Sequence, residues 1–364
     1  MEERILKKTA IFVAVLSVTA CIAVFYLPRL GTVSEKILKA YKIYQTKTKE
    51  ESLNMTGLEL LEYNNEQAQK EQNEDAEFVS QLRLELPLGV SGDDLEIMQN
   101  YVTQTINIVI PYANSEYFYE YPMLGRSDNI DSLTYESRNG YGIVEFVTDQ
   151  VFELDTSFDK DYFYIDFLTP QEVYDKVVVI DAGHGGNAPG ATKQGVYEKD
   201  IDLSIVLKLK EIIDASGNTS IGVYYTRLTD ENPSFEHRVG LANKSNADLL
   251  ISVHNNSTPS GRMSSINGTE VLYDESKESL EFSSMGFAQI CLEEVIAMTG
   301  SANKGLVTGS EMYMIRNSEA PVALIEVGFM TNQVELTNLC SEEYQMKVAQ
   351  GIYNAILRAF AEGY

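Results

Sequence analysis

The chain is short of cysteine, histidine and basic residues. Its 364 residues include three cysteines, too few for a disulfide framework, and only three histidines. There are 54 acidic residues against 28 basic ones, which gives a formal net charge of −26. Because such a surface repels phosphate backbones, we expect no nucleic-acid partner. The length allows two domains of roughly 150 residues and a tail.

A long uncharged run lies near the N-terminus. Residues 9–27 carry no charged side chain and follow Lys7 and Lys8. A helix of this length matches the hydrocarbon core of a bilayer, about 30 Å thick. We therefore expect a membrane anchor in residues 1–30, with a transmembrane helix at 9–27. A lipoprotein cleavage site at Cys21 and a cleaved signal peptide are the alternatives, although the apolar run continues beyond Cys21.

The pattern changes twice between this run and residue 175. Residues 31–77 are polar and rich in Glu, Gln and Asn, which predicts a stalk or linker, either helical or flexible. Residues 78–170 contain short β-branched, aromatic or alternating segments, and Asn139-Gly140 is typical of a hairpin turn. This second region is predicted to be a small β-rich domain.

Short apolar runs alternate with helical patterns from residue 175 to the C-terminus. Strands are expected at 177–180, 221–226, 249–253, 269–273, 312–315 and 322–326. Helices are expected at 203–213, 282–298 and 344–360. The alternation predicts an α/β domain over 175–364, with a six-stranded, mostly parallel sheet and helices on both faces.

Three polar side chains lie at or just beyond the ends of these segments, and a fourth follows one of them across a loop. His184 and His254 each follow an apolar run, and Glu326 ends another. Glu198 follows His184 across a glycine-rich loop. Functional sites in open α/β sheets form at the carboxyl ends of strands, so we expect these side chains to meet there.

The residue types at this edge indicate a hydrolytic zinc site. Two histidines and one glutamate around an open position are a common ligand set of such sites, with a further carboxylate acting as base. The alternatives are hydrogen-bonded structural histidines and a glutamate that only braces a ligand. Gly185-Gly186 is not a phosphate loop, because no Gly-Lys-Ser/Thr follows it.

Six motifs from Lys176 onward occur in an order that resembles the zinc-dependent N-acetylmuramoyl-L-alanine amidases of the amidase-3 type. The motifs are 179–186, 195–199, 226–227 with Asp230, 238–243, 252–256 and 325–332. The resemblance covers roughly half the chain, and Ala182 stands where the family usually has proline.

This resemblance implies His184, Glu198 and His254 as ligands of Zn²⁺. It implies Glu326 as the catalytic base, which takes a proton from the attacking water and delivers it to the leaving amine. The bond cleaved joins the lactyl group of N-acetylmuramic acid to L-alanine in peptidoglycan. A zinc hydrolase acting on another amide, in a peptide or an acetamide, and an inactive wall-binding scaffold are the alternatives.

The resemblance also implies a substrate outside the cytoplasm. We therefore expect a single-pass membrane protein whose catalytic domain is extracytoplasmic and acts in wall remodelling, division or sporulation. The β-rich domain loosely resembles the wall-targeting modules of related enzymes. The alternative interpretations are a spacer domain and a module that binds another protein. No pattern identifies a protein activator.

Overall fold

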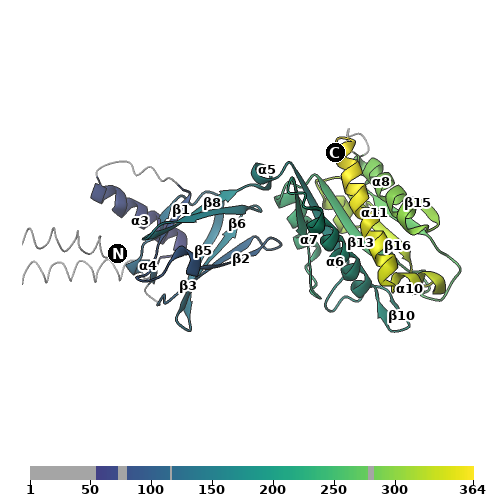
Figure 1. Ribbon diagram of the computed structural model, residues 1–364, viewed down its shortest axis with the longest axis horizontal. Helices are drawn as coiled ribbons and strands as arrows, with labels where there is room; N and C mark the ends of the chain where they lie inside the picture. Colours follow the sequence, from purple (N-terminus) through teal and green to yellow (C-terminus); the bar gives the residue numbers. More distant parts are fainter. Residues whose placement is uncertain (1–54, 73–79, 115–116, 278–282) are drawn as a thin grey trace, which may run out of the picture. The chain divides into compact units, whose positions relative to one another are not determined.

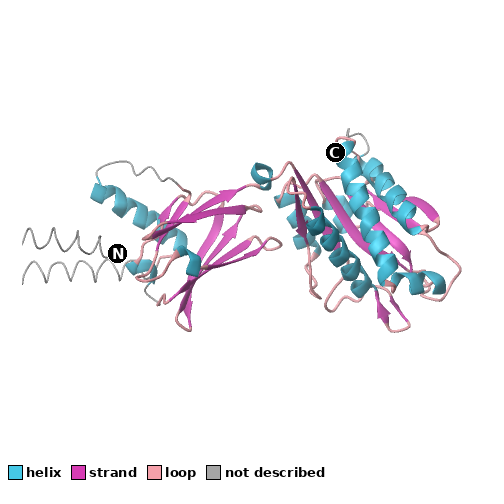
Figure 2. Cartoon of the chain, viewed as in Figure 1, coloured by secondary structure: helices cyan, strands magenta, loops and turns pink. Residues whose placement is uncertain are grey.

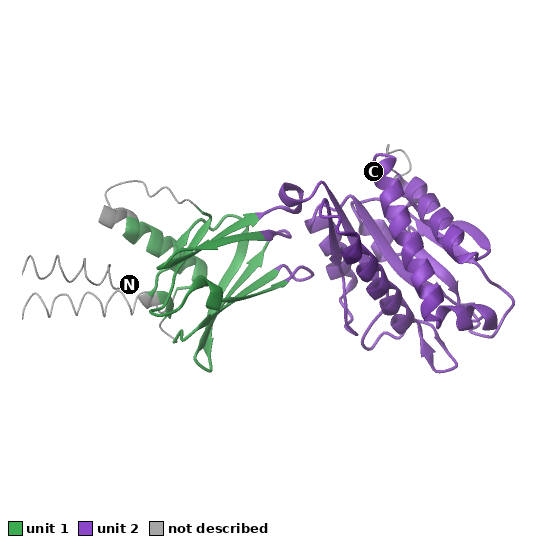
Figure 3. Ribbon diagram, in the orientation of Figure 1, with its two compact units in different colours: residues 1–99, 105–148, 154–167 green, residues 100–104, 149–153, 168–364 purple. Residues whose placement is uncertain are grey.

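The structure is a computed structural model that describes residues 55–72, 80–114, 117–277 and 283–364. The described residues form two compact units (Figure 3). The first unit contains residues up to 99, 105–148 and 154–167, and the second contains 100–104, 149–153 and 168–364. The predicted transmembrane helix at 9–27 lies outside the described residues. Within the described ranges, no helix is both long and apolar enough to cross a bilayer.

The first unit is built from two four-stranded sheets, with strand orders β4-β1-β8-β7 and β2-β3-β6-β5 (Figure 1). The strands are β1 (Leu82–Glu85), β2 (Glu96–Asn100), β3 (Thr105–Pro111), β4 (Leu124–Gly125), β5 (Ile130–Arg138), β6 (Tyr141–Thr148), β7 (Glu153–Phe158) and β8 (Tyr162–Leu168). Phe146 on β6 contacts Phe167 on β8 edge to face, with ring centroids 6.1 Å apart. The buried faces of the two sheets therefore pack together, and the region predicted to be β-rich forms strands.

The predicted hairpin turn lies between β5 and β6. Asn139 has φ of 55° and Gly140 has φ of 81°. Two successive positive φ angles suit the right-handed twist of a two-residue hairpin, which is why this dipeptide is favoured there. The short elements of the unit are η1 (Gly92–Asp94) and α4 (Tyr117–Glu120).

Helix α3 (Gly57–Gln72) lies inside the range predicted to be a polar stalk. Its Leu60 and Leu61 are buried, and the Asn65 side chain donates a hydrogen bond of 2.6 Å to the backbone oxygen of Gly125. This part of 31–77 therefore packs on the β-rich unit. The region is polar on average, so its composition did not indicate that one side of the helix carries a narrow row of apolar residues.

The second unit contains a six-stranded sheet with the order β12-β9-β13-β16-β14-β15. Its strands are β9 (Lys176–Ala182), β12 (Ile221–Tyr225), β13 (Leu249–Asn256), β14 (Thr269–Tyr273), β15 (Asn303–Thr308) and β16 (Val322–Phe329). The first four strands in this order are parallel, whereas β14 runs antiparallel to β16. The sheet is therefore mixed, and the prediction of six strands is confirmed.

Helices cover both faces of this sheet, as predicted (Figure 2). Val178 and Ile180 on β9 pack in a core with α6, α8 and α11, while Val177 and Val179 pack with α7 and α9 on the other face. Burial on both faces explains the continuous apolar run of this strand. The helices are α5 (Pro170–Val173), α6 (Glu198–Ser216), α7 (Phe235–Lys244), α8 (Ser284–Thr299), α9 (Tyr313–Asn317), α10 (Gln333–Leu339), α11 (Glu342–Ala361) and η2 (Glu275–Lys277).

One predicted strand is wrong and one observed strand was missed. Residues 312–315 lead into and form the short helix α9, in which Met314 and Ile315 are buried. The sixth strand is instead β15, whose residues are exposed or only partly buried. An exposed edge strand with this polar composition carries no apolar run, and so the pattern did not reveal it.

Candidate metal centre

Three of the predicted site residues meet at a single oxygen atom. The Nε2 atom of His184 lies 3.0 Å from Oε1 of Glu198, and Nδ1 of His254 lies 3.1 Å from the same oxygen. The two imidazole rings are 4.9 Å apart between centroids and nearly perpendicular. The structure therefore brings together the three side chains predicted to bind a metal.

The backbone around His184 is shaped to admit the other two side chains. His184 follows the end of β9 and has φ of 57°, in the left-handed region. A Cβ atom at Gly183 would lie 2.4 Å from the ring of His254, and one at Gly190 would lie 2.5 Å from Oε2 of Glu198. Glycine is required at both positions because side chains of the site occupy the space that a Cβ would fill.

Two buried arginines hold the backbone of residues 182–184 in place. Arg238 donates to the backbone oxygen of His184 at 2.5 Å and forms an ion pair of 2.6 Å with Asp181. Arg227 donates to the backbone oxygens of Ala182 and Gly183. Asp181 therefore acts on this backbone through Arg238, which it holds in place.

Glu198 is the first residue of α6, and both its oxygens are held by backbone donors. Its Oε2 accepts a hydrogen bond of 2.6 Å from the N–H of Ala191, and its Oε1 accepts one of 3.0 Å from the N–H of Asn255. Burial by itself would raise the pKa of Glu198, but contact with His184 and His254 lowers it on balance. Glu198 is therefore an anion next to two imidazoles.

A fourth candidate ligand, Asp202, was not predicted. His184, Glu198, Asp202 and His254 each offer one ligand atom, and these atoms all lie within 4.8 Å of one another, so the group could hold a metal ion. Asp202 is fully buried, and burial raises its pKa, with the charge of Glu198 adding to the effect. The available signal was its spacing, because residues four apart share one face of a helix.

Glu326 lies beside this group but is not part of it. It occupies the position on β16 that pairs with His254 on β13. Its Oε2 atom is buried and has no hydrogen-bond partner. Burial raises the pKa of Glu326 to about 8, and the charges of Glu198 and Glu270 contribute further. Glu326 can therefore exchange a proton near neutral pH.

The group opens into a cleft of about 770 Å³. His184, Glu198, His254 and Glu326 all line it. One wall is apolar, because Phe235, which is 60% exposed, stacks on Tyr313 with ring centroids 6.1 Å apart. This volume is within the range of small-molecule sites.

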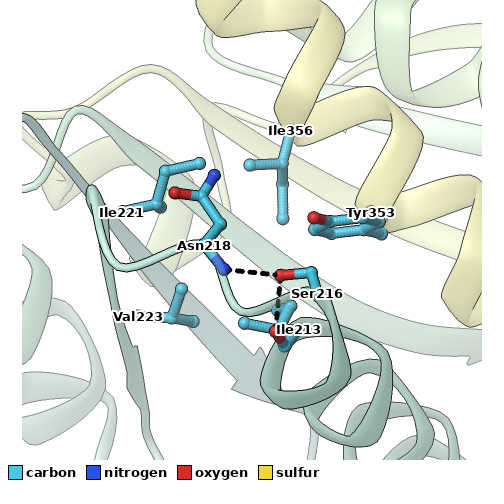
Figure 4. Close-up of a pocket in the computed structure, with 7 residues that line it drawn as sticks. All are labelled: Ile213, Ser216, Asn218, Ile221, Val223, Tyr353 and Ile356. Carbon is cyan, nitrogen blue, oxygen red and sulfur yellow. Dashed lines mark hydrogen bonds between the residues drawn. The ribbon is translucent and has the colours of Figure 1, made fainter.

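A second pocket of about 10 Å³ contains none of the candidate site residues. It is lined mainly by apolar side chains where the end of α6 and strand β12 meet α11 (Figure 4). The Ser216 hydroxyl closes one side by donating to the backbone oxygen of Ile213 at 2.6 Å. A space of this volume holds at most about one water molecule, so it is not a ligand site.

The described geometry agrees with what comparisons with known proteins found. Residues 178–358 match the family Amidase_3, described as N-acetylmuramoyl-L-alanine amidase. The protein YqiI of Bacillus subtilis is 34% identical over 181 residues, which are 50% of this chain and 83% of YqiI. The germination-specific N-acetylmuramoyl-L-alanine amidase of the same organism is 32% identical over 51% of this chain and 81% of that protein.

Two further similarities cover the same half of the chain. The N-acetylmuramoyl-L-alanine amidase LytC of B. subtilis is 31% identical over 50% of this chain and 35% of LytC. Among solved structures, the catalytic domain of CwlV, an N-acetylmuramoyl-L-alanine amidase from Bacillus (Paenibacillus) polymyxa, is 34% identical and matches with a TM-score of 0.47 over 51% of this chain and 98% of that domain. Because the germination-specific amidase is 32% identical and is matched over 81% of its own length, the chain belongs to the Amidase_3 family of N-acetylmuramoyl-L-alanine amidases.

Proposed function

We propose that the chain is a zinc-dependent hydrolase that cleaves the amide between the lactyl group of N-acetylmuramic acid and L-alanine in peptidoglycan. Its membership of the Amidase_3 family supports this activity. The observation that carries the zinc site is the convergence of His184 and His254 on one oxygen of Glu198, at 3.0 and 3.1 Å.

The donor set fits zinc. Two imidazoles and a carboxylate are the ligands of many hydrolytic zinc sites, and they leave one tetrahedral position open. His184, Glu198 and His254 would hold the ion, and their common position on the cleft leaves it accessible to substrate. When bound, zinc polarises the scissile carbonyl and makes water more acidic.

Glu326 is the residue we assign to proton transfer. It lines the same cleft and lies across the strand pair from His254. Its pKa of about 8 shows that its environment disfavours the charge, and a nearby cation would lower this pKa. A carboxylate balanced in this way accepts a proton from the attacking water and returns it to the leaving amine.

Product analysis tests the activity against the alternatives. The purified chain is incubated with muropeptides, and the products are identified by mass spectrometry. Release of the intact stem peptide with a free amine on L-alanine supports the proposal. Cleavage between two amino acids of the stem would show a peptidase, loss of acetate would show a deacetylase, and binding without any product would show a scaffold.

We also propose that residues 9–27 anchor the chain in the cell membrane, with the domain at 175–364 outside the cytoplasm. The uncharged run supports the anchor, and a peptidoglycan substrate supports the orientation. The full-length protein is expected to sediment with membranes and to require detergent for release. Recovery of the uncleaved chain in the soluble fraction without detergent would refute the anchor.

A further inference from the structure

Asp202 is a buried carboxylate with half of its hydrogen-bonding capacity unused. It lies one turn after Glu198 on α6 and has an exposed fraction of 0%. Its Oδ1 accepts a hydrogen bond of 2.7 Å from the side-chain nitrogen of Asn255. Its Oδ2 is buried and has no hydrogen-bond partner. A buried charge without compensation is costly, so the ionised form of this carboxylate needs a cation that the hydrogen bonds do not supply.

No basic side chain fills that role among the described residues. Arg227 is close enough for its charge to act on Asp202, but its Nε and Nη2 atoms donate to the backbone oxygens of Ala182 and Gly183. The groups that do surround Asp202 are His184, Glu198 and His254, with candidate ligand atoms within 4.8 Å of one another. A metal ion bound by this group would therefore supply the positive charge that Asp202 lacks.

A purely structural role would be met better by a neutral side chain. The side-chain oxygen of Asn255 is also buried and without a partner. Either an asparagine at position 202 or a protonated Asp202 would offer a donor to that oxygen, and the contact between α6 and β13 would be kept without a buried charge. The charged carboxylate is therefore unfavourable for packing alone, unless a cation is bound beside it.

We propose that Asp202 is a fourth anionic group of the metal site, which increases the affinity of this chain for its ion. The inference rests on the metal site proposed above and concerns how tightly that site holds the ion. Asp202 is not among the residues that line the cleft, so it acts on the ion by its charge and on Asn255 by its hydrogen bond. It is a positioning residue and does not contact substrate.

The test is the dissociation constant for Zn²⁺, measured on the purified full-length chain by competition with a chromophoric chelator. Asp202→Asn is compared with wild type and with Asp200→Asn, which removes the same charge from an exposed position on the same helix. We expect Asp202→Asn to weaken Zn²⁺ binding by about 10–100-fold, which is the range typical of residues that support the metal ligands without binding the metal directly. The control should bind within a factor of about two of wild type, as expected for a solvent-exposed charge that water and salt screen.

Thermal unfolding of the metal-free proteins separates this role from a structural one. Asp202→Asn should melt at the same temperature as wild type or higher without metal, and should gain less stability when Zn²⁺ is added. A lower melting temperature without metal, together with weaker binding, would show that Asp202 only supports the fold. Unchanged affinity in Asp202→Asn would also overturn the inference.

A charge exchange gives a further readout. In the double variant Asp202→Asn with Asn255→Asp, the carboxylate and the amide trade places across the same hydrogen bond. Recovery of Zn²⁺ affinity relative to Asp202→Asn would support a charge effect, and no recovery would argue against it. If wild type itself binds no Zn²⁺, the proposed metal site fails and this inference fails with it, a result distinct from equal binding by wild type and variant.

Discussion

His254 on β13 and Glu326 on β16 are direct neighbours across a parallel strand pair. His254 also contacts Glu198, whereas Glu326 has one buried oxygen without a hydrogen-bond partner. The two residues therefore have different surroundings, although they share one edge of the sheet. Substitutions at the two positions should consequently have different effects.

Glu326→Gln should retain the metal and lose activity. Glutamine has nearly the same size, and Glu326 is outside the group that could hold the ion. Because an amide does not accept the proton, turnover should fall by about 10²–10⁴-fold while the Michaelis constant changes little. Zinc content is measured by atomic absorption and turnover by release of free L-alanine amine.

Glu270→Gln is the matched control, since Glu270 pairs with Glu326 on the neighbouring strand β14. It should keep turnover within a few fold of wild type. If Glu326→Gln loses its zinc, Glu326 is a ligand and Glu198 becomes the candidate base. Wild-type turnover in Glu326→Gln would place the proton transfer elsewhere.

Alanine at His184, Glu198 or His254 should abolish both metal binding and activity. Each substitution leaves two of three ligands, so the loss of affinity should exceed the ~10–100-fold typical of outer-shell partners. Chelation of wild type should have the same effect on activity and should be reversed by added Zn²⁺. Full zinc content in any of the three variants would remove that residue from the site.

Stability should distinguish Glu198 from the two histidines. Its carboxylate accepts hydrogen bonds from the backbone N–H groups of Ala191 and Asn255. The substitution Glu198→Ala leaves both N–H groups without this acceptor. The metal-free variant should lose about 1–3 kcal/mol of unfolding free energy for each donor left buried. Denaturant unfolding of Glu198→Ala and Glu198→Gln compares this loss, because glutamine keeps one acceptor oxygen.

Without metal, the chain should lose stability as the pH rises towards 8. The pKa of Glu326 is about 8 in the folded protein, above its ordinary value of 4.5. Between these values the folded chain holds a proton that the unfolded chain has released, so unfolding becomes more favourable as the pH rises. Urea unfolding of the chelated protein at about pH 5 and about pH 9 measures the change.

Glu326→Gln supplies the reference for this measurement, because it lacks the titrating group. Its unfolding free energy should fall less between the two pH values than that of wild type. Equal falls in the two proteins would mean that Glu326 does not hold a proton in the folded chain.

The sequence predicted the site residues at the strand ends, but it did not predict the buried residue beside them. His184, His254 and Glu326 were found because each follows or ends an apolar run in the sequence, and the ends of such runs converge in this type of sheet. Asp202 was missed because it lies inside a helix, where only its spacing from Glu198 marks it. That spacing indicates a shared helix face, but burial beside the site depends on how α6 packs against β13.

The errors in the fold have a similar origin. The apolar run at 312–315 predicted a strand, but four residues are too few to distinguish a strand from a short helix. Strand β15 lies at the edge of the sheet, where polar residues remain in solvent. Helix α3 lies in the range predicted to be a stalk or linker from its polar composition, and of its residues 57–68 only Leu60, Leu61 and Ala68 are buried. These features depend on tertiary contacts, which local patterns do not contain.

Gly183→Ala should damage the metal site without changing any candidate ligand. The added Cβ would lie 2.4 Å from the His254 ring, so the imidazole would have to shift, and its contact with Glu198 would change. Overpacking of this kind typically costs about 1–3 kcal/mol, and zinc affinity should fall with the loss of ligand geometry. Gly240→Ala on α7 is the control, because a Cβ there meets no atom within 4 Å and alanine favours helix. Calorimetric titration with Zn²⁺ and thermal unfolding of both variants compare the two sites. Normal zinc affinity in Gly183→Ala would show that His254 is not confined by this backbone, and the role assigned to Gly183 would be wrong.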